Sequence, residues 1–243
     1  MSKSKKSSTA SPALAQEKRR AEQERQKKKT RILLLGAILL VVVLFAAMFV
    51  LASKNTGNPG FPYDELPRLG AADAPVKLVE FGDYKCPACA QFSGVVKPQL
   101  VKDYIEKGKA ALYFVNMTFI GPDSETASLA ALSVYHQNRE AFWKYYDALY
   151  ANQGDEKTEW ATEDFLVELA QKEQLDVDYD LLRKDIQERT YEDELARDNA
   201  TAKDSGVRST PSLFINGIKA NEPFNLDAIA KEIETAAKAV ETE

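Results

Sequence analysis

The sequence contains very few of the cysteine and histidine residues that form structural zinc sites, with two cysteines and one histidine among 243 residues. The cysteines form a single C-x-x-C pair, Cys86-Pro87-Ala88-Cys89, and the histidine, His136, lies far from them in the sequence. A structural zinc site needs about four ligands, and the chain has no second C-x-x-C to supply them. A purely structural disulfide is also a poor interpretation, because closing so short a loop stabilises little through chain entropy. We therefore predict a redox-active dithiol and no metal site.

Charged residues are absent from a long apolar run, Ile32 to Ala52. At 1.5 Å per residue this run of about 21 residues extends about 30 Å, the thickness of the hydrocarbon core of a bilayer. Residues 1–31 hold eleven Lys and Arg, so the positive-inside rule places them in the cytoplasm. A cleaved signal peptide is the alternative, but its apolar region is about 7–15 residues long. We expect one uncleaved transmembrane helix in the cell membrane, with everything after Lys54 extracytoplasmic.

The charge differs in sign between the two ends of the chain. Residues 1–54 hold twelve Lys and Arg against three Glu, whereas the later residues hold 20 Lys and Arg against 34 Asp and Glu. A basic end can be a nucleic-acid arm, but directly before a membrane span it is more often a topology signal that contacts anionic lipids. We expect no nucleic-acid partner, and an exterior domain in a compartment where disulfides persist.

Beyond a linker rich in Gly and Pro, the pattern of apolar residues predicts one α/β domain. Strands are predicted over 76–81, 111–119 and 212–217, and Asn216-Gly217 is typical of a hairpin turn. Helices are predicted over 89–105 (with a kink at Pro98), 125–136, 141–150, 162–171, 179–187, 191–203 and 226–240. This order predicts a thioredoxin-like α/β fold with an inserted helical domain. The predicted parts are a cytoplasmic basic segment (1–31), a transmembrane helix (32–52), a linker (53–67), a thioredoxin-like domain in two parts (68–120 and 206–243) and the helical insertion between them (121–205).

Three stretches together resemble one family. They are Val-Glu-Phe followed by Cys-Pro-x-Cys, a Phe-Trp pair in the insertion, and Ser-Thr-Pro-Ser-Leu-Phe-Ile-Asn-Gly near the C-terminus. The chain resembles the DsbA-like thiol–disulfide oxidoreductases, above all the membrane-anchored members of Gram-positive bacteria. Two positions depart from the best-known oxidising members. Pro87-Ala88 stands where they have Pro-His, and Thr210 stands where they have Val.

The resemblance and the residue chemistry together define a candidate site. Cys86 at the first turn of a helix is the expected nucleophile, because a helix N-terminus favours a thiolate, and Cys89 is the expected resolving partner. The resemblance implies that Glu80 moves the proton of the buried cysteine, although a strand-end acid can simply face solvent. It also implies a cis Thr210–Pro211 bond, with Thr210 and Pro211 binding extended substrate by strand addition and Pro211 covering the sulfurs. The redox-active disulfide is then the only redox group, with no further cofactor.

Other conspicuous side chains are given structural interpretations. We expect Lys85 to be exposed and of little electrostatic effect, and His136 to be a packed or solvated helical residue. Aromatic residues in the insertion are expected to form its core, with a peptide groove as the alternative. These are Phe142, Trp143, Tyr145, Tyr146 and Tyr150.

The predicted function is disulfide formation in exported proteins that carry free thiols. A tethered reductase, for example in cytochrome c maturation, uses the same residues at a lower potential, and a non-catalytic module that binds extended chains is a third hypothesis. The resemblance implies a quinone-linked membrane reoxidant of the DsbB type. We expect a monomer, because no dimerisation segment is visible in the sequence.

Overall fold

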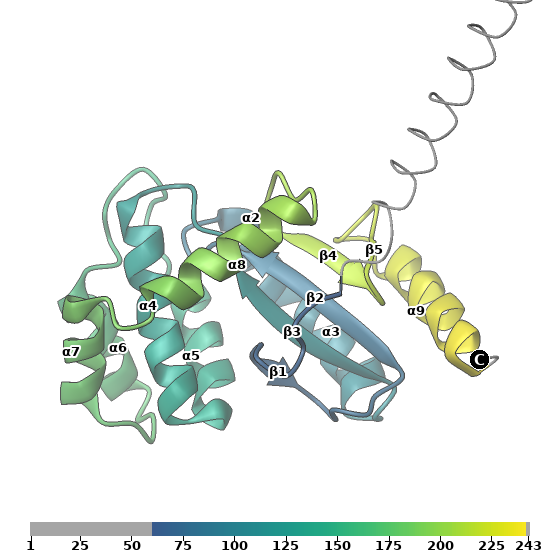
Figure 1. Ribbon diagram of the computed structural model, residues 1–243, viewed down its shortest axis with the longest axis horizontal. Helices are drawn as coiled ribbons and strands as arrows, with labels where there is room; N and C mark the ends of the chain where they lie inside the picture. The colour runs from purple at the N-terminus through teal and green to yellow at the C-terminus, as the bar shows by residue number, and fades with distance from the viewer. Residues whose placement is uncertain (1–59, 242–243) are drawn as a thin grey trace, which may run out of the picture. The chain divides into compact units, whose positions relative to one another are not determined.

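The computed structural model of this chain describes residues 60–241 (Figure 1). The basic segment 1–31, the predicted transmembrane helix 32–52 and most of the predicted linker lie outside the described residues. Between residues 60 and 241, none of the helices combines the length and the apolar character needed to cross a bilayer.

A five-stranded sheet lies at the centre of the described domain (Figure 1). Its strand order is β1-β3-β2-β4-β5, with β2 and β3 parallel and the other neighbouring strands antiparallel. The strands are β1 (Arg68–Leu69), β2 (Val76–Gly82), β3 (Ala110–Asn116), β4 (Ser212–Ile215) and β5 (Ile218–Lys219). The predicted strand 76–81 is therefore confirmed, and the predicted strand 212–217 is found as β4 followed by the expected turn at Asn216-Gly217. The predicted strand 111–119 ends three residues early, where the backbone N–H of Thr118 bonds to the Asn199 side chain instead.

Alternate residues of the central strand β2 enter two separate cores, as the period of two in a strand requires. Leu78 belongs to the larger core, with the helices of the insertion, whereas Val79 and Phe81 belong to a smaller core on the opposite face. Phe61 and Leu66 are buried in that smaller core. The predicted linker 53–67 thus overlaps the packed domain, because these two apolar side chains cover one face of the sheet. Glu80 shares the parity of Leu78 and faces the larger core.

A single helical stretch with two π-helical segments follows β2, and we call it the interrupted helix. It consists of α2 (Pro87–Gln91), η1 (Phe92–Val96), α3 (Lys97–Leu100) and η2 (Val101–Ile105). The interruption predicted at Pro98 is found where η1 gives way to α3. Pro98 has no N–H to continue the regular hydrogen-bond ladder, so a change of helical pitch at this position is expected.

The predicted helical insertion is confirmed. It comprises α4 (Pro122–Gln137), α5 (Arg139–Ala151), α6 (Glu163–Lys172), α7 (Tyr179–Glu188) and α8 (Glu192–Asp204). Helices α4 to α7 form a cluster at one end of the sheet, and α8 returns across the sheet (Figure 1). Helix α9 (Leu226–Glu241) closes the domain. Helix α5 also packs against the interrupted helix, which brings the insertion beside the C-x-x-C pair.

Candidate active site

The loop after β2 delivers both cysteines to the start of the interrupted helix. Cys86 is the N-cap of α2, Pro87 occupies the first turn, and the Cys86 backbone N–H donates to the Asp83 carbonyl over 2.9 Å. Proline suits this position because the first N–H groups of a helix have no partner within the helix. Cys86 is 7% exposed and Cys89 is fully buried, and both are free thiols. The pair therefore has one sulfur near the surface and one beneath it.

Hydrogen bonds to the sulfur lower the pKa of the Cys86 thiol to about 6. The hydrogen bond from the Cys89 thiol has the largest effect, and burial opposes it. Thr210 and the backbone N–H groups of Cys89 and Ala88 lower the pKa further. Hydrogen bonds to the charged form of a group are a standard cause of such shifts. Cys86 is thus largely a thiolate at neutral pH, without an imidazolium at position 88.

Cys89 and Glu80 are both buried under the Cys86 thiol, and both favour the protonated form. Burial raises the pKa of Cys89 well above its ordinary value, and its hydrogen bond to Cys86 and the charge of Glu80 act in the same direction. Burial also raises the pKa of Glu80 to about 8. The Glu80 side chain is fully buried, and Oε2 accepts a hydrogen bond of 2.7 Å from the Tyr146 hydroxyl. Glu80 is therefore buried near the cysteines, as predicted, and the alternative in which it faces solvent is wrong.

The register of β4 brings the Thr210-Pro211 segment to the same site. Ser212 is paired with Phe81 and Leu213 with Glu80, so the residues just before β4 lie beside the loop that carries Cys86. The Thr210–Pro211 peptide bond is cis. When Cys86 is protonated, its Sγ atom can donate to the Thr210 carbonyl oxygen, which lies 3.4 Å away. Pro211 is buried, whereas Thr210 is partly exposed. All five predicted site residues are therefore neighbours, and their individual roles stay predictions.

Lys85 differs from the prediction, because it is 2% exposed and carries its charge inside the protein. Its ammonium group forms an ion pair with Asp123 of α4 and donates to the Thr158 carbonyl over 2.9 Å. A Cβ atom at Gly121 would lie 2.9 Å from Lys85 Nζ, so glycine leaves the space that this approach needs. The expectation that Lys85 is exposed is wrong, because a partner 38 residues away stabilises the buried charge.

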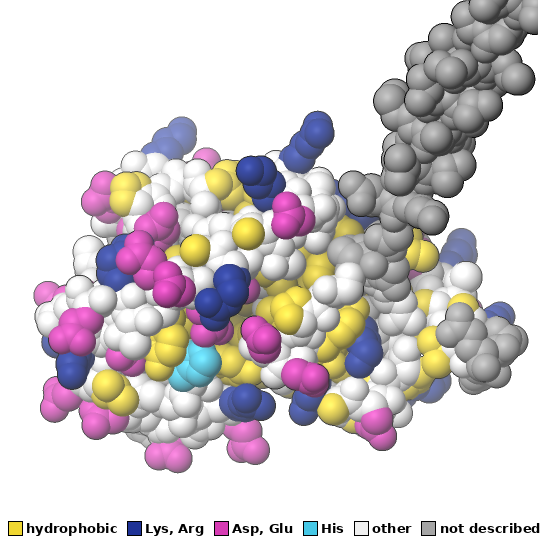
Figure 2. Space-filling view, in the orientation of Figure 1, with side chains coloured by type: hydrophobic (Ala, Val, Ile, Leu, Met, Phe, Trp, Pro, Cys, Tyr) yellow, Lys and Arg dark blue, Asp and Glu magenta, His cyan; other side chains and the backbone are white. Residues whose placement is uncertain are grey.

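The remaining conspicuous residues have the structural surroundings expected of them. His136 lies at the protein surface (Figure 2), where its ring stacks on Tyr191 and Nε2 is 2.7 Å from Glu194 Oε2. The aromatic residues of α5 are buried in the larger core. Two of them, Trp143 and Tyr150, also line a pocket at the junction with the interrupted helix.

Sequence reasoning missed three participants in the surroundings of Glu80. Tyr146 of α5 donates to its carboxylate, and Lys97 and Asp147 influence its ionisation from the same side. Tyr146 and Tyr150 are four residues apart on one helix face. This spacing predicted that both rings are buried, but it did not predict the hydrogen bond from the Tyr146 hydroxyl to Glu80. Within the described part of the chain, no group of three or more His, Cys, Asp or Glu side chains is placed to hold a metal ion.

A thiolate-stabilising helix N-terminus, a buried partner thiol and an adjacent cis proline on this α/β fold define a thiol–disulfide oxidoreductase. Residues 64–235 match the family model described as Thioredoxin. The chain belongs to this family, and within it to the DsbA-like oxidoreductases. It is 40% identical over 185 residues to the probable disulfide bond formation protein D of Bacillus cereus, covering 76% of this chain and 85% of that protein.

Solved structures agree with this assignment. The crystal structure of oxidised BdbD from Bacillus subtilis superimposes with a TM-score of 0.71 at 32% identity, covering 75% of this chain and 97% of that one. The structure of Chlamydia trachomatis DsbA superimposes with a TM-score of 0.65 at 26% identity, covering 72% and 93% of the two chains.

Proposed function

We propose that this protein is a membrane-anchored, extracytoplasmic oxidase that introduces disulfide bonds into exported proteins through the Cys86–Cys89 disulfide. The unequal pair of thiols is the observation that carries the proposal. A Cys86 thiol with a pKa of about 6 stabilises the reduced dithiol, so the disulfide is a stronger oxidant than that of an unperturbed pair. The disulfide serves as the only redox group, and no metal or bound cofactor is required.

The exchange proceeds in two steps that conserve atoms and electrons. A substrate thiolate attacks Cys86 Sγ, the Cys86–Cys89 bond breaks, and Cys89 leaves and takes a proton from Glu80. A second substrate thiolate then attacks the substrate sulfur of the mixed disulfide, and Cys86 leaves as a thiolate. The substrate is oxidised by two electrons and the enzyme is reduced by two. The partly exposed Thr210, with its carbonyl 3.4 Å from Cys86 Sγ, is suited to align the extended substrate during both steps.

The compartment and partners follow from the N-terminal sequence and the direction of the reaction. We propose that the helix 32–52 holds the domain outside the cytoplasm, where substrates emerge with free thiols. The reduced enzyme must return its two electrons to an acceptor, for which a quinone-linked membrane protein of the DsbB type is the proposed partner. The bacterial relatives named for disulfide bond formation support the disulfide-forming direction of the reaction.

The reduction potential of Cys86–Cys89 tests the proposal. We expect a value near about −120 mV when the protein is equilibrated with glutathione buffers, and a Cys86 thiolate absorbance that titrates near pH 6. A potential near about −270 mV would instead assign the protein as a tethered reductase. Cys86→Ala serves as the control for both measurements, and an unchanged cellular phenotype of that variant would favour a non-catalytic chain-binding role.

A further inference from the structure

A pocket of about 430 Å³ lies between the end of α8 and the segment that follows β3, and we call it the cationic pocket. Its lining includes Phe119, Asn199, Lys203 and Arg208, and none of the described residues that line it is an Asp or a Glu. The side chains of Lys203 and Arg208 are both exposed, and the Phe119 side chain is 54% exposed. The pocket therefore presents two positive charges and an aromatic ring to solvent, with no negative charge among them.

Both segments that line the cationic pocket continue into contacts with Cys86. Arg208 comes two residues before Thr210, whose carbonyl oxygen is 3.4 Å from Cys86 Sγ. In the other segment, the Phe119 backbone N–H donates to Asp83 Oδ2 over 3.0 Å, and the Asp83 carbonyl accepts from the Cys86 N–H over 2.9 Å. A substrate chain held at Cys86 therefore lies within a few residues of the pocket.

The end of α8 explains why Arg208 faces outward. Gly206 has a φ of 69°, and its N–H donates to the Lys203 carbonyl over 3.0 Å, so the helix ends in the left-handed turn that glycine permits. The next residue, Val207, is buried in the smaller core. Arg208 follows this anchor and is exposed. The turn therefore directs the chain from Lys203 toward the active site and places the second cation beside the first.

Two hydrogen bonds join the two segments of the pocket. The Thr118 backbone N–H donates to Asn199 Oδ1 over 2.9 Å, and Asn199 Nδ2 donates to Thr118 Oγ1 over 2.9 Å. Because the two side chains satisfy each other, the spacing of the segments does not depend on a ligand. The pocket is therefore formed before a substrate binds.

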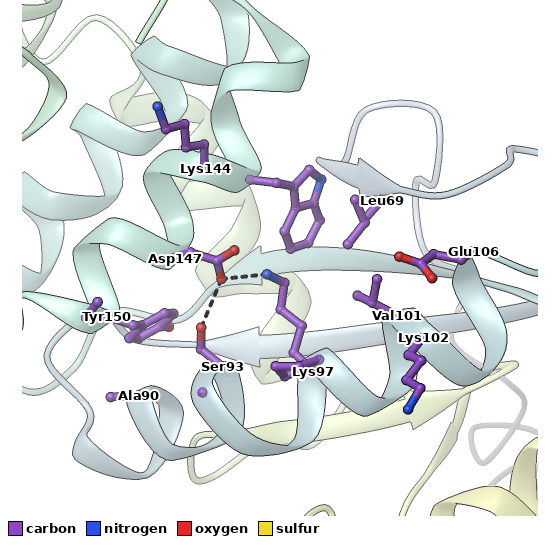
Figure 3. A pocket seen from close by; sticks show the side chains of 14 residues that line it. Leu69, Ala90, Ser93, Lys97, Val101, Lys102, Glu106, Lys144, Asp147 and Tyr150 are labelled. Carbon is purple, nitrogen blue, oxygen red and sulfur yellow. Dashed lines mark hydrogen bonds and ion pairs between the residues drawn. The ribbon is translucent and has the colours of Figure 1, made fainter. Parts of the chain in front are cut away.

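The cations of this pocket differ from Lys97 in having no acidic partner. In the pocket between α5 and the interrupted helix, Lys97 points toward Asp147 and forms an ion pair with it (Figure 3). By contrast, neither Lys203 nor Arg208 forms an ion pair with any other described residue. After residue 54, the chain holds 34 Asp and Glu against 20 Lys and Arg. Two unpaired cations in one pocket of an acidic domain provide a local site for a negatively charged group.

We propose that the cationic pocket binds a carboxylate of the substrate chain, so that the enzyme prefers cysteines with an acidic residue two or three positions away. This inference rests on the proposed function and adds no step to it, since the substrate thiolate still attacks Cys86 Sγ and Cys89 still leaves. In a substrate strand paired with the segment before Pro211, residues rise about 3.3 Å each and every second side chain shares a face. The substrate residue opposite Arg208 is therefore two positions from the one opposite Thr210.

An acidic neighbour also changes the reactivity of the substrate thiol. In water, a nearby carboxylate disfavours the thiolate, which is the attacking species. At the cationic pocket, Lys203 and Arg208 compensate the charge of the carboxylate, which removes this disadvantage. The enzyme and a neutral small disulfide should therefore rank an acidic peptide and its neutral counterpart in opposite orders.

The preference is tested with reduced peptides that carry two cysteines and either Glu or Gln near both of them. In one pair of peptides this residue stands two positions after each cysteine, and in a second pair two positions before. Oxidised protein is mixed with each peptide at about 0.05 M salt, and the reaction is stopped with acid and followed by chromatography. In at least one pair we expect the Glu peptide to react about threefold to tenfold faster than the Gln peptide, with less advantage at about 0.5 M salt.

Oxidation of the same peptides by 2-hydroxyethyl disulfide gives their ranking without the pocket. We expect the Glu peptide to be the slower one in that reaction. If the Glu peptides react with the enzyme no faster than the Gln peptides in both pairs, the proposal is wrong.

Substitutions assign the preference to the pocket. Arg208→Gln and Lys203→Gln should each lower the ratio of the Glu rate to the Gln rate about twofold to threefold, and the double variant should abolish the preference. Arg208→Glu should favour a Lys peptide over the Gln peptide. Arg197→Gln removes the same charge from an exposed arginine of α8 that lines a different pocket, and it should leave the ratio unchanged. If Arg197→Gln lowers the ratio as much as Arg208→Gln, the net charge of the domain sets the preference and the pocket does not.

Failure of the pocket and failure of the proposed function give different results. If the protein oxidises none of the peptides, the proposed oxidase function fails and the role of the pocket fails with it. If the protein oxidises the Glu and Gln peptides at equal rates, the proposed function stands and the carboxylate site alone is wrong.

Discussion

Two lysine–aspartate pairs connect the surroundings of the C-x-x-C pair to the helical insertion, and they differ in how far solvent reaches them. Lys85 and Asp123 have side chains that are 3% and 7% exposed, whereas Lys97 and Asp147 have side chains that are 7% and 53% exposed. We call them the closed pair and the open pair. Lys85 lies one residue before Cys86 and Lys97 lies eight residues after Cys89. Both pairs therefore connect the segment that carries the cysteines to the insertion.

The two pairs differ mainly in the exposure of the aspartate, and this difference gives them different effects. In the closed pair, Asp123 also accepts from the Ala161 backbone N–H over 3.1 Å, and Lys85 also donates to Thr158. The closed pair therefore fixes the start of α4 and a loop of the insertion against the segment that carries Cys86. In the open pair, the Asp147 carboxylate is hydrated while Lys97 remains near Glu80. The charge of Lys97 in the open pair therefore acts on Glu80 and lowers its pKa.

The largest effect is expected from breaking the closed pair. Lys85→Met leaves Asp123 as a buried charge without its counter-ion, which costs about 3–5 kcal/mol of the free energy of unfolding. Urea denaturation at pH 7 measures this. Lys85→Met/Asp123→Asn should recover part of the loss, because no uncompensated charge remains. Lys144→Met, at an exposed site, should stay within about 0.5 kcal/mol of the wild type. If Lys85→Met also lost no more than about 0.5 kcal/mol of the free energy of unfolding, the closed pair would not stabilise the fold.

A second prediction concerns Glu80, the buried acid beside the open pair. Its pKa is about 8 in the folded protein against an ordinary value of 4.5. Between these two pH values the folded state binds more protons than the unfolded state, so stability falls as the pH rises from about 4.5 to about 8. Glu80→Gln should remove this loss, on the order of a few kcal/mol by pH 8, because Gln stays neutral.

Urea denaturation of the reduced protein at pH 5 and pH 8 measures the effect of Glu80→Gln. The variant should gain stability over the wild type at pH 8 and differ little near pH 5. Some pH dependence below pH 7 should persist, since burial raises the pKa of Asp198 to about 7. An equal effect of the substitution at both pH values would mean that Glu80 is ionised throughout this range.

The closed and open pairs also mark the limit of what the sequence predicts. The cysteines, the β2 strand and the helices of the insertion follow from motifs and from periodicity within one segment. The burial of Lys85 and Lys97 depends instead on partners 38 and 50 residues away, and a lysine in isolation is predicted to be exposed. The cis state of Thr210–Pro211 came from family resemblance, because most X-Pro bonds are trans.

The sequence analysis missed strand β1 and the packing of Phe61 for a related reason. Strand β1 has only two residues, too few for an alternating pattern, and it exists because it pairs with Leu112 and Tyr113 of β3. Phe61 stands among Gly and Pro residues that are typical of a linker, yet its ring contacts those of Phe81 and Phe214. Both features result from tertiary contacts with strands elsewhere in the chain.

The smallest predicted effect separates the two pairs by their response to salt. Double-mutant cycles with Lys→Met and Asp→Asn give the coupling free energy of each pair, which we expect to be about 1 kcal/mol for the open pair and larger for the closed pair. Raising the salt concentration from about 0.05 M to about 0.5 M should reduce the coupling of the open pair by roughly half, because ions approach the hydrated Asp147. The coupling of the closed pair should not change, since neither side chain is accessible to them. If both couplings fell equally, water would have to reach Lys85 and Asp123 in solution, and the distinction between a positioning pair and a tuning pair would be lost.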